Sequence, residues 1–322
     1  MRGCFADNAR LQAVINIVHI RQQTFTPHLT FYDKFFDIQI QIPYTPFNKK
    51  QLLKKGELVS LRILIGVLIY RKGAYILDKF LSNQAKIQQQ SPSSELVIAT
   101  AEHDFAGEIE SMMNRWQLKG RILTYEIVKP EKAKNIIWNI ASGREAVRQY
   151  FLYHSQAEGL LFLDADMIYE PKVVEIMSRE LNGYDVVFSG YHRRDFGIGL
   201  AGAGCLLLNR DALEKIRVRC FEFGNGEIIT EDTTLEMDLF RCGCHIKKGI
   251  FVSLAHYINL TESRHISPTK VSLFRKVSNN AFIRYCLIRA SIMIHYNIPK
   301  HLRVLLNGIV KYTKKHRRYV KS

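Results

Sequence analysis

From residue 58 onward, short continuous apolar runs alternate along the chain with segments in which apolar residues recur at helical spacing. Short apolar runs typical of buried strands lie at Leu61–Tyr70, Leu96–Ala99, Ile122–Val128, Gly159–Leu163, Asp185–Ser189, Cys205–Leu208 and Ile250–Leu254. Between these runs, apolar residues recur at helical spacing, at 74–87, 107–118, 143–154, 171–183 and 233–243. Strands that alternate with helices of this length predict an α/β fold with a mostly parallel sheet flanked by helices.

Turn and cap residues bound several of these elements. Pro171 lies where a helix would begin and Gly183 where it would end. Thr233 and Glu236 form a capping-box pattern, which predicts the first turn of a later helix that ends at Gly243.

The strand at Gly159–Leu163 is followed at once by Asp164, Ala165 and Asp166. In an extended chain, residues i and i+2 point to the same side, so the two carboxylates can converge on one cation. Open α/β sheets bind ligands at the carboxyl ends of their strands, and Mg²⁺ or Mn²⁺ prefers carboxylate oxygens. The sequence therefore predicts a divalent-cation site here, with a solvated acidic loop as the alternative.

Composition limits the class of protein. The chain has 322 residues, 47% hydrophobic and 24% charged, which is enough for one large α/β domain with additions or for two domains. It has no apolar run of membrane-spanning length and no signal-peptide pattern, so we expect a cytoplasmic protein. The six cysteines lack the density of a disulfide scaffold, so free thiols in a reducing compartment are expected.

The net charge of +16 is unevenly distributed. After Glu262 the chain has 14 Lys and Arg residues and no Asp or Glu. We therefore divide it into an N-terminal extension of unknown role at 1–58, a catalytic domain at 59–262 and a basic amphipathic helical tail at 263–322. Cations interleaved with apolar residues at 270–322 suit an anionic membrane surface, which would make the protein peripheral. Nucleic-acid phosphates or a solvated helix pair are the alternatives.

Four motifs occur in an order that resembles a known family. They are Asn139–Ala146 with its Arg144, Leu160–Asp166, Gly202–Arg210, and Glu231-Asp232 followed by Gly243 and His256. Over about residues 60–262 the sequence resembles nucleotide-sugar glycosyltransferases of the GT-A fold, most like the family-2 type. The resemblance implies a D-x-D motif and the GT-A form of the α/β sheet.

The resemblance also implies roles for individual residues. Asp166, with Asp164 and His256, would hold Mn²⁺ or Mg²⁺ against the diphosphate of the donor. Asp164 can instead reach the ribose. Asp232 would be the base of a single displacement with inversion, and Glu231 a second base or an acceptor contact. Without the family, the two acids read as helix N-terminal residues and the histidine as a strand-end side chain.

Other parts of the donor would meet residues beside the same sheet edge. Tyr70 and Glu102 follow the first two strands, where such enzymes hold the base and ribose, and Arg144 can contact the diphosphate. The expected substrates are a UDP- or GDP-sugar and a glycan or lipid-linked acceptor. Two other functions remain open: a nucleotidyltransferase of related fold, for which Arg71-Lys72-Gly73 is only a fragment of the usual phosphate loop, and a basic nucleic-acid-binding protein on an inactive fold.

Overall fold

The computed structural model describes residues 61–272, apart from 132, 134, 195–196 and 223–227, together with residues 280–297. The extension expected at 1–58 lies outside the described residues, as does much of the tail expected at 263–322.

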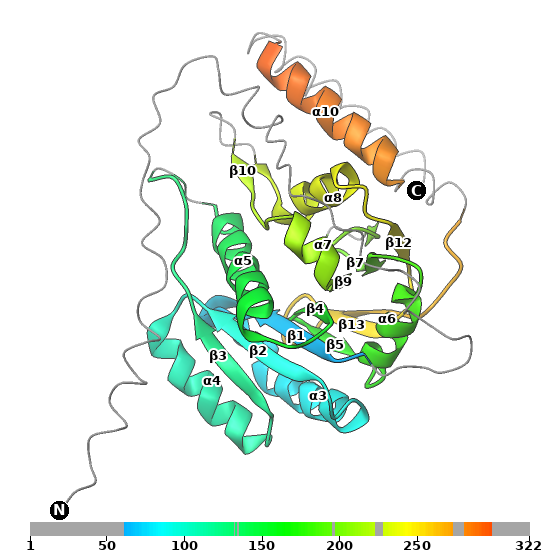
Figure 1. The fold of residues 1–322 in the computed structure, drawn as a ribbon. Coiled ribbons are helices and arrows are strands. Elements are labelled where there is room, and N and C mark those ends of the chain that lie inside the picture. The colour runs from blue at the N-terminus through cyan, green and yellow to red at the C-terminus, as the bar shows by residue number, and fades with distance from the viewer. Residues whose placement is uncertain are drawn as a thin grey trace, which may run out of the picture. The chain divides into compact units, whose positions relative to one another are not determined.

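A seven-stranded sheet forms the centre of the described chain (Figure 1). Its strands, in spatial order, are β12 (Ile246–Gly249), β6 (Val186–Ser189), β9 (Cys205–Asn209), β4 (Gly159–Asp164), β1 (Ile63–Leu68), β2 (Glu95–Thr100) and β3 (Gly120–Thr124). All neighbours pair in parallel except that β9 runs antiparallel to both β4 and β6. The predicted class is confirmed: an α/β fold with a mostly parallel sheet flanked by helices.

Helices cover both faces of this sheet (Figure 1). One face packs against α3 (Leu77–Gln90), α4 (His103–Arg115) and α6 (Val173–Leu181), and the other against α5 (Ile137–His154), α7 (Arg210–Lys215) and α8 (Glu231–Arg241). A short 3-10 helix, η3 (Arg71–Ile76), joins β1 to α3. The central strands are apolar over most of their length because both of their faces are buried.

A second, three-stranded antiparallel sheet lies beside the end of β4. Its order is β14 (Ser263–Ile266), β13 (Leu254–Tyr257) and β5 (Met167–Tyr169). The strand predicted at 250–254 is wrong: β12 ends at Gly249 and β13 begins at Leu254, so most of this apolar run connects the two strands. His256 lies inside β13 rather than beyond a strand end. His256 pairs with Met167 in this sheet, and this pairing brings the histidine next to Asp166.

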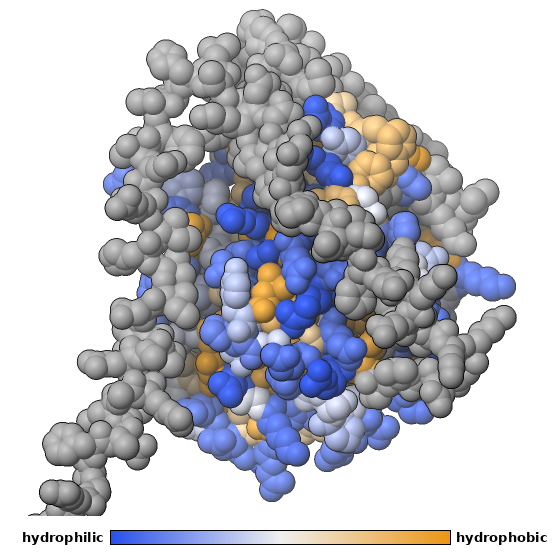
Figure 2. Space-filling model, in the orientation of Figure 1, coloured by the Kyte–Doolittle hydropathy of each residue, from blue (hydrophilic) through white to orange (hydrophobic). Residues whose placement is uncertain are grey.

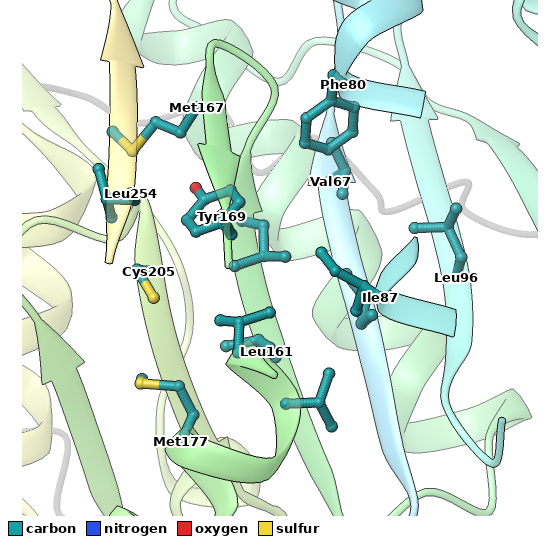
Figure 3. Close-up of a cluster of buried hydrophobic side chains, with 14 of the residues drawn as sticks. Val67, Phe80, Ile87, Leu96, Leu161, Met167, Tyr169, Met177, Cys205 and Leu254 are labelled. Carbon is teal, nitrogen blue, oxygen red and sulfur yellow. The ribbon is translucent and has the colours of Figure 1, made fainter. Parts of the chain in front are cut away.

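The core beneath this junction is built from large apolar side chains (Figure 3). Met167, Tyr169, Cys205 and Leu254 lie close together there, all buried. The hydroxyl of Tyr169 donates to the carbonyl of Gly204 at 2.5 Å and accepts from the backbone N–H of Asp164 at 2.9 Å. The turn that carries Asp166 is therefore fixed from below by a packed aromatic residue.

Two short hairpins and one C-terminal helix complete the described elements. The hairpins are β7 (Tyr191–His192) with β8 (Ile198–Gly199), and β10 (Phe221–Glu222) with β11 (Ile228–Ile229). The helix α10 (Ala281–Asn297) packs on α8, where the Phe240 ring contacts those of Phe282 and Tyr285. The tail expected from residue 263 therefore begins with the strand β14, and its described helix is α10.

The structure corrects one predicted helix start. Thr230 occupies the N-cap of α8, so Thr233 lies in its first turn and forms no capping box with Glu236. Glu236 is instead buried between Lys248 and Arg284, where its carboxylate compensates the charges of two cations from other elements. The predicted end of this helix is confirmed, since Gly243 has a φ of 70° after the last turn.

Candidate functional site

The two D-x-D carboxylates lie at the carboxyl end of β4 and are bound by different cations. The strand ends at Asp164, and residues 165 and 166 form a turn before β5 begins. The extended-chain rule for residues i and i+2 therefore does not describe this segment. Arg144 binds Asp164, whereas Asp166 faces His256 and Arg194.

A buried cluster joins Asp164 to the first turn of α8. The guanidinium of Arg144, on α5, donates through Nη2 to Asp164 Oδ1 at 2.8 Å and through Nη1 to Glu231 Oε1. The side chains of Arg144 and Glu231 are 6% and 7% exposed. Arg144 therefore connects the end of β4, the middle of α5 and the start of α8 through one shared charge.

The cluster has two carboxylates for one cation, and their pKa values reflect this. Burial raises the pKa of Glu231 to about 7, although Arg144 opposes the shift. Burial likewise raises the pKa of Asp164 against the pull of Arg144. Among the described residues, none forms a hydrogen bond with Glu231 Oε2, although this atom is buried.

Asp166 has the opposite environment. Its Oδ2 atom accepts from Arg194 Nη2 at 2.9 Å and faces His256 Nε2 at 3.4 Å. Burial would raise the pKa of Asp166, but its hydrogen bonds to His256 and Arg194 outweigh this and hold it below the usual value. Asp166 is therefore the ionised carboxylate of the pair.

The pairing of Asp166 with His256 fits a cation shared with a substrate. His256 Nδ1 lies 2.5 Å from the carbonyl oxygen of His192, so Nδ1 carries a hydrogen and Nε2 is the nitrogen turned to Asp166. Among the described residues, no three His, Cys, Asp or Glu side chains form a metal-ligand cluster. Mg²⁺ and similar ions often take one or two protein ligands and complete their shell with water and phosphate oxygens. An Asp166–His256 pair fits that mode and not an all-protein cage.

Asp232 is the more accessible of the two acids that open α8. It is half-buried, and its Oδ1 accepts from the hydroxyl groups of Thr230 and Thr233. Both hydroxyls come from the first turn of the same helix, so they fix the orientation of the carboxylate locally. Asp232 and Glu231 therefore differ: one is held at the surface by hydroxyls, the other is buried on Arg144.

Tyr70 and Glu102 lie where the first two strands end, as predicted, but they have different neighbours. Burial, with the charges of Asp166 and Asp164, raises the pKa of Tyr70, which places its hydroxyl in the field of the D-x-D acids. Glu102 accepts from the backbone N–H of Arg71 at 2.6 Å and so ties η3 to the end of β2. Tyr70 thus adjoins the acidic pair, whereas Glu102 is engaged with the loop after β1.

The glycine-rich loop leaves room for side chains of the site itself. A Cβ at Gly202 would collide with the hydroxyl of Tyr191, and a Cβ at Gly204 with Oδ2 of Asp164. The Tyr191 ring in turn meets His256 edge-on, with centroids 5.8 Å apart. These two glycines therefore serve the close packing of Tyr191 and Asp164.

Sequence reasoning missed three residues that shape this site: Tyr169, Tyr191 and Arg194. Tyr169 and Tyr191 lie in short strands without a clear apolar pattern, and their contacts depend on the tertiary fold. Arg194 could have been predicted from the sequence. Arg193 and Arg194 follow the strand of residues 186–189, at the same edge of the sheet as the D-x-D acids.

Comparisons with known proteins give a consistent but loose picture. No family model and no curated protein sequence matches the chain. Similar solved structures include the mannosyltransferase PcManGT from Pyrobaculum calidifontis in complex with GDP-Man and Mn²⁺, at 12% identity and a TM-score of 0.42, covering 80% of this chain and 83% of that one. Glucosyl-3-phosphoglycerate synthase from Mycobacterium tuberculosis, with Mn²⁺ and UDP, has 15% identity and a TM-score of 0.41, covering 74% and 81%.

A third neighbour is TarS 1-349 from S. aureus in complex with UDP-GlcNAc, with 14% identity, a TM-score of 0.43 and coverage of 72% of this chain and 67% of that one. Structural similarity at this level assigns no activity to this chain.

Proposed function

We propose that this protein is a metal-dependent glycosyltransferase that moves a sugar from a UDP- or GDP-sugar to an acceptor hydroxyl. One observation carries the proposal: Asp166 and His256 face each other after the carboxyl end of β4. Arg144 joins that strand end to the first turn of α8, which also carries the half-buried Asp232. Asp166 and His256 would hold Mn²⁺ or Mg²⁺, which supplies positive charge to the leaving diphosphate when bound. Asp164 would hold the ribose or share the cation.

In the proposed reaction, Asp232 accepts the proton of the acceptor hydroxyl as that oxygen bonds to the anomeric carbon. The bond from this carbon to the diphosphate breaks, and its electron pair leaves with the diphosphate. A single displacement of this kind inverts the anomeric configuration. The half-exposed position of Asp232 supports this role, because a base must reach the acceptor.

Glu231 is the second candidate base. Its pKa of about 7 suits proton transfer near neutral pH. Its side chain is 7% exposed and is bound to Arg144, which leaves little access for an acceptor. We therefore assign Glu231 to the Arg144 cluster and Asp232 to the chemistry.

The first test is a binding experiment that needs no acceptor. Thermal shift and calorimetry with UDP, GDP and their sugars, with and without Mn²⁺, should show nucleotide binding that depends on Mn²⁺. Asp166→Ala should abolish this binding, while Asp211→Ala, at an exposed acid in the first turn of α7, should leave it unchanged. A wild-type chain that binds none of these nucleotides contradicts the proposed function.

The second test separates binding from chemistry. Asp232→Asn should retain Mn²⁺-dependent nucleotide binding and lose transfer or donor hydrolysis by about 100-fold or more, as expected for loss of a general base. Retained turnover would remove Asp232 from this role. The released product also distinguishes the alternative function, because a nucleotidyltransferase would release pyrophosphate instead of a nucleoside diphosphate.

We further propose that the basic tail attaches the protein to an anionic membrane surface, where a lipid-linked acceptor would be found. On α10, Arg284 binds the buried Glu236 at 2.8 Å, so this side faces α8. The exposed positions between 282 and 290 are apolar, with Phe282 59% and Leu287 63% exposed. Figure 2 shows apolar colour at the upper right, where Figure 1 draws the start of α10. None of the helices in the described ranges has the length and hydrophobicity to cross a bilayer.

Vesicle sedimentation tests this attachment. The full chain should sediment with vesicles that contain an anionic lipid and not with neutral ones, and Phe282→Glu with Leu287→Glu should weaken the binding. Tyr153→Glu, at an exposed aromatic residue of α5, is the control. Equal binding by the double variant, or binding to RNA or DNA without binding to vesicles, would contradict the membrane proposal.

A further inference from the structure

Arg194 binds Oδ2 of Asp166, the oxygen atom that a divalent cation would require as a ligand. Its Nη2 is 2.9 Å from Asp166 Oδ2, the same oxygen that faces His256. A guanidinium has no lone pair with which to bind a metal and keeps its charge at any relevant pH. Two cations cannot both occupy this oxygen at low cost, so Arg194 and a metal ion are competitors for Asp166.

The backbone around Arg194 is anchored while its side chain is exposed. The guanidinium of Arg264, on β14, donates to the carbonyl oxygens of Arg193 at 2.7 Å and of Arg194 at 3.0 Å. The Arg193 N–H donates to the carbonyl of Gly197 at 2.7 Å. The Arg194 side chain is 59% exposed. A guanidinium released from Asp166 would therefore stay within one side-chain length of the site and would be free to reorient.

We propose that Arg194 occupies Asp166 until a divalent cation displaces it, and that the released guanidinium then binds the diphosphate of the donor. This inference rests on the proposed function, which supplies the diphosphate. The diphosphate would share the cation held by Asp166, so it comes to rest next to Arg194. A guanidinium matches phosphate oxygens in geometry and charge, and the exposed Arg194 is free of the carboxylate cage that holds Arg144.

The proposal predicts effects of opposite sign from one substitution. In Arg194→Gln the competitor is gone, so Mn²⁺ alone should bind more tightly, by roughly two- to fivefold, the range for an ion pair whose arginine is 59% exposed. With Mn²⁺ saturating, UDP or GDP should bind about tenfold or more weakly, because a charge-assisted contact to the diphosphate is lost. A substitution that merely loosened the fold would weaken both.

Titration calorimetry measures both affinities on the full chain, first with Mn²⁺ and then with UDP or GDP at saturating Mn²⁺. Arg179→Gln, an exposed arginine on α6, is the matched control and should change neither affinity. The proposal is overturned if Arg194→Gln binds Mn²⁺ no more tightly than wild type, or binds the nucleotide equally well. Wild-type protein that binds no nucleotide would instead overturn the proposed function itself, so the two failures are distinguishable.

Discussion

Asp164 and Asp166 are two residues apart in the sequence, yet they belong to two different electrostatic regions. Asp164 shares the buried Arg144 with Glu231, and burial raises the pKa of both acids against the pull of this single cation. Asp166 has two basic partners, His256 and the exposed Arg194, and its pKa falls. We call Asp164, Arg144 and Glu231 the inner region, which has two acids for one cation. Asp166, His256 and Arg194 form the outer region, which has two basic groups for one acid, so one of these basic groups can be exchanged.

This difference indicates a division of labour between the two acids. A cation delivered from solvent can replace Arg194 at Asp166, because that arginine loses little when it returns to water. Replacing Arg144 would leave the buried carboxylate of Glu231, and that of Asp164 at 32% exposure, without their shared cation, which is costly. The inner region is therefore suited to holding α5, β4 and α8 in register, and the outer region to exchanging one positive charge for another.

The largest expected effect comes from breaking the inner region. Arg144→Met should lower the free energy of unfolding by about 3 to 5 kcal/mol, because it leaves Glu231 and Asp164 without their cation. Arg194→Met, which removes one of the two basic partners of Asp166 and leaves His256, should cost less than about 1 kcal/mol, since the Arg194 side chain is 59% exposed. Chemical denaturation of both variants measures the contrast.

Arg115→Met is the control for the loss of an arginine in itself. Its ion pair with Asp78 is exposed on both sides, at 60% and 58%, so the variant should resemble Arg194→Met. Equal costs for Arg144→Met and Arg194→Met would contradict the division into an inner and an outer region.

A second, smaller effect sharpens the same contrast through pH. The pKa of Glu231 is about 7 in the folded protein, above its ordinary 4.5, so the folded state favours the protonated carboxyl. Between these two values the unfolded chain ionises first, and folding stability falls as pH rises. Between pH 4.5 and pH 7, the free energy of unfolding should fall by about 3 kcal/mol in total, and it should change little outside this range for this reason.

Glu231→Gln should remove this dependence. The difference in unfolding free energy between wild type and Glu231→Gln should therefore change between pH 4.5 and pH 7 and become constant above it, in favour of the variant. Glu175→Gln, at an exposed acid in the first turn of α6, should show a constant difference over the same range. A flat profile for Glu231→Gln would mean that Arg144 fully compensates the charge.

The sequence predicted the strands and helices well where a single period dominated. The runs around β1, β2, β4, β6 and β9 were placed correctly because buried strands need continuous apolar residues. It could not predict that β9 is antiparallel, since an apolar run has no direction. The position of β13 was also missed, because this strand pairs with β5, a partner only three residues long.

The candidate site was predictable as a set of acids but not as a set of contacts. Asp164, Asp166 and Asp232 were found because each follows or opens an element at one edge of the sheet. Which cation binds which acid depends on side-chain reach across elements far apart in sequence, as in the contact of Arg144 with Glu231, 87 residues away. Arg194 was missed for that reason, although it lies in the loop region that follows β6 and β7.

The smallest effect tests whether the two acids act independently. In Gly204→Ala, the added Cβ meets Oδ2 of Asp164 and lies 2.9 Å from the methyl group of Met167, so overpacking should cost about 1 to 3 kcal/mol. Gly107→Ala, in α4, meets nothing within 4 Å and should be neutral or slightly stabilising. Nucleotide binding should weaken in Gly204→Ala if Asp164 holds the ribose.

The affinity for Mn²⁺ alone is the deciding measurement on the same variant. It should stay within about twofold of wild type, the change expected when no ligand contact is lost, because Asp166, in the turn after β4, and His256, on β13, are the proposed ligands of the cation. If Gly204→Ala weakens Mn²⁺ binding as much as nucleotide binding, Asp164 is itself a ligand of the cation. The two carboxylates then converge, and the boundary between the inner and outer regions does not run between them.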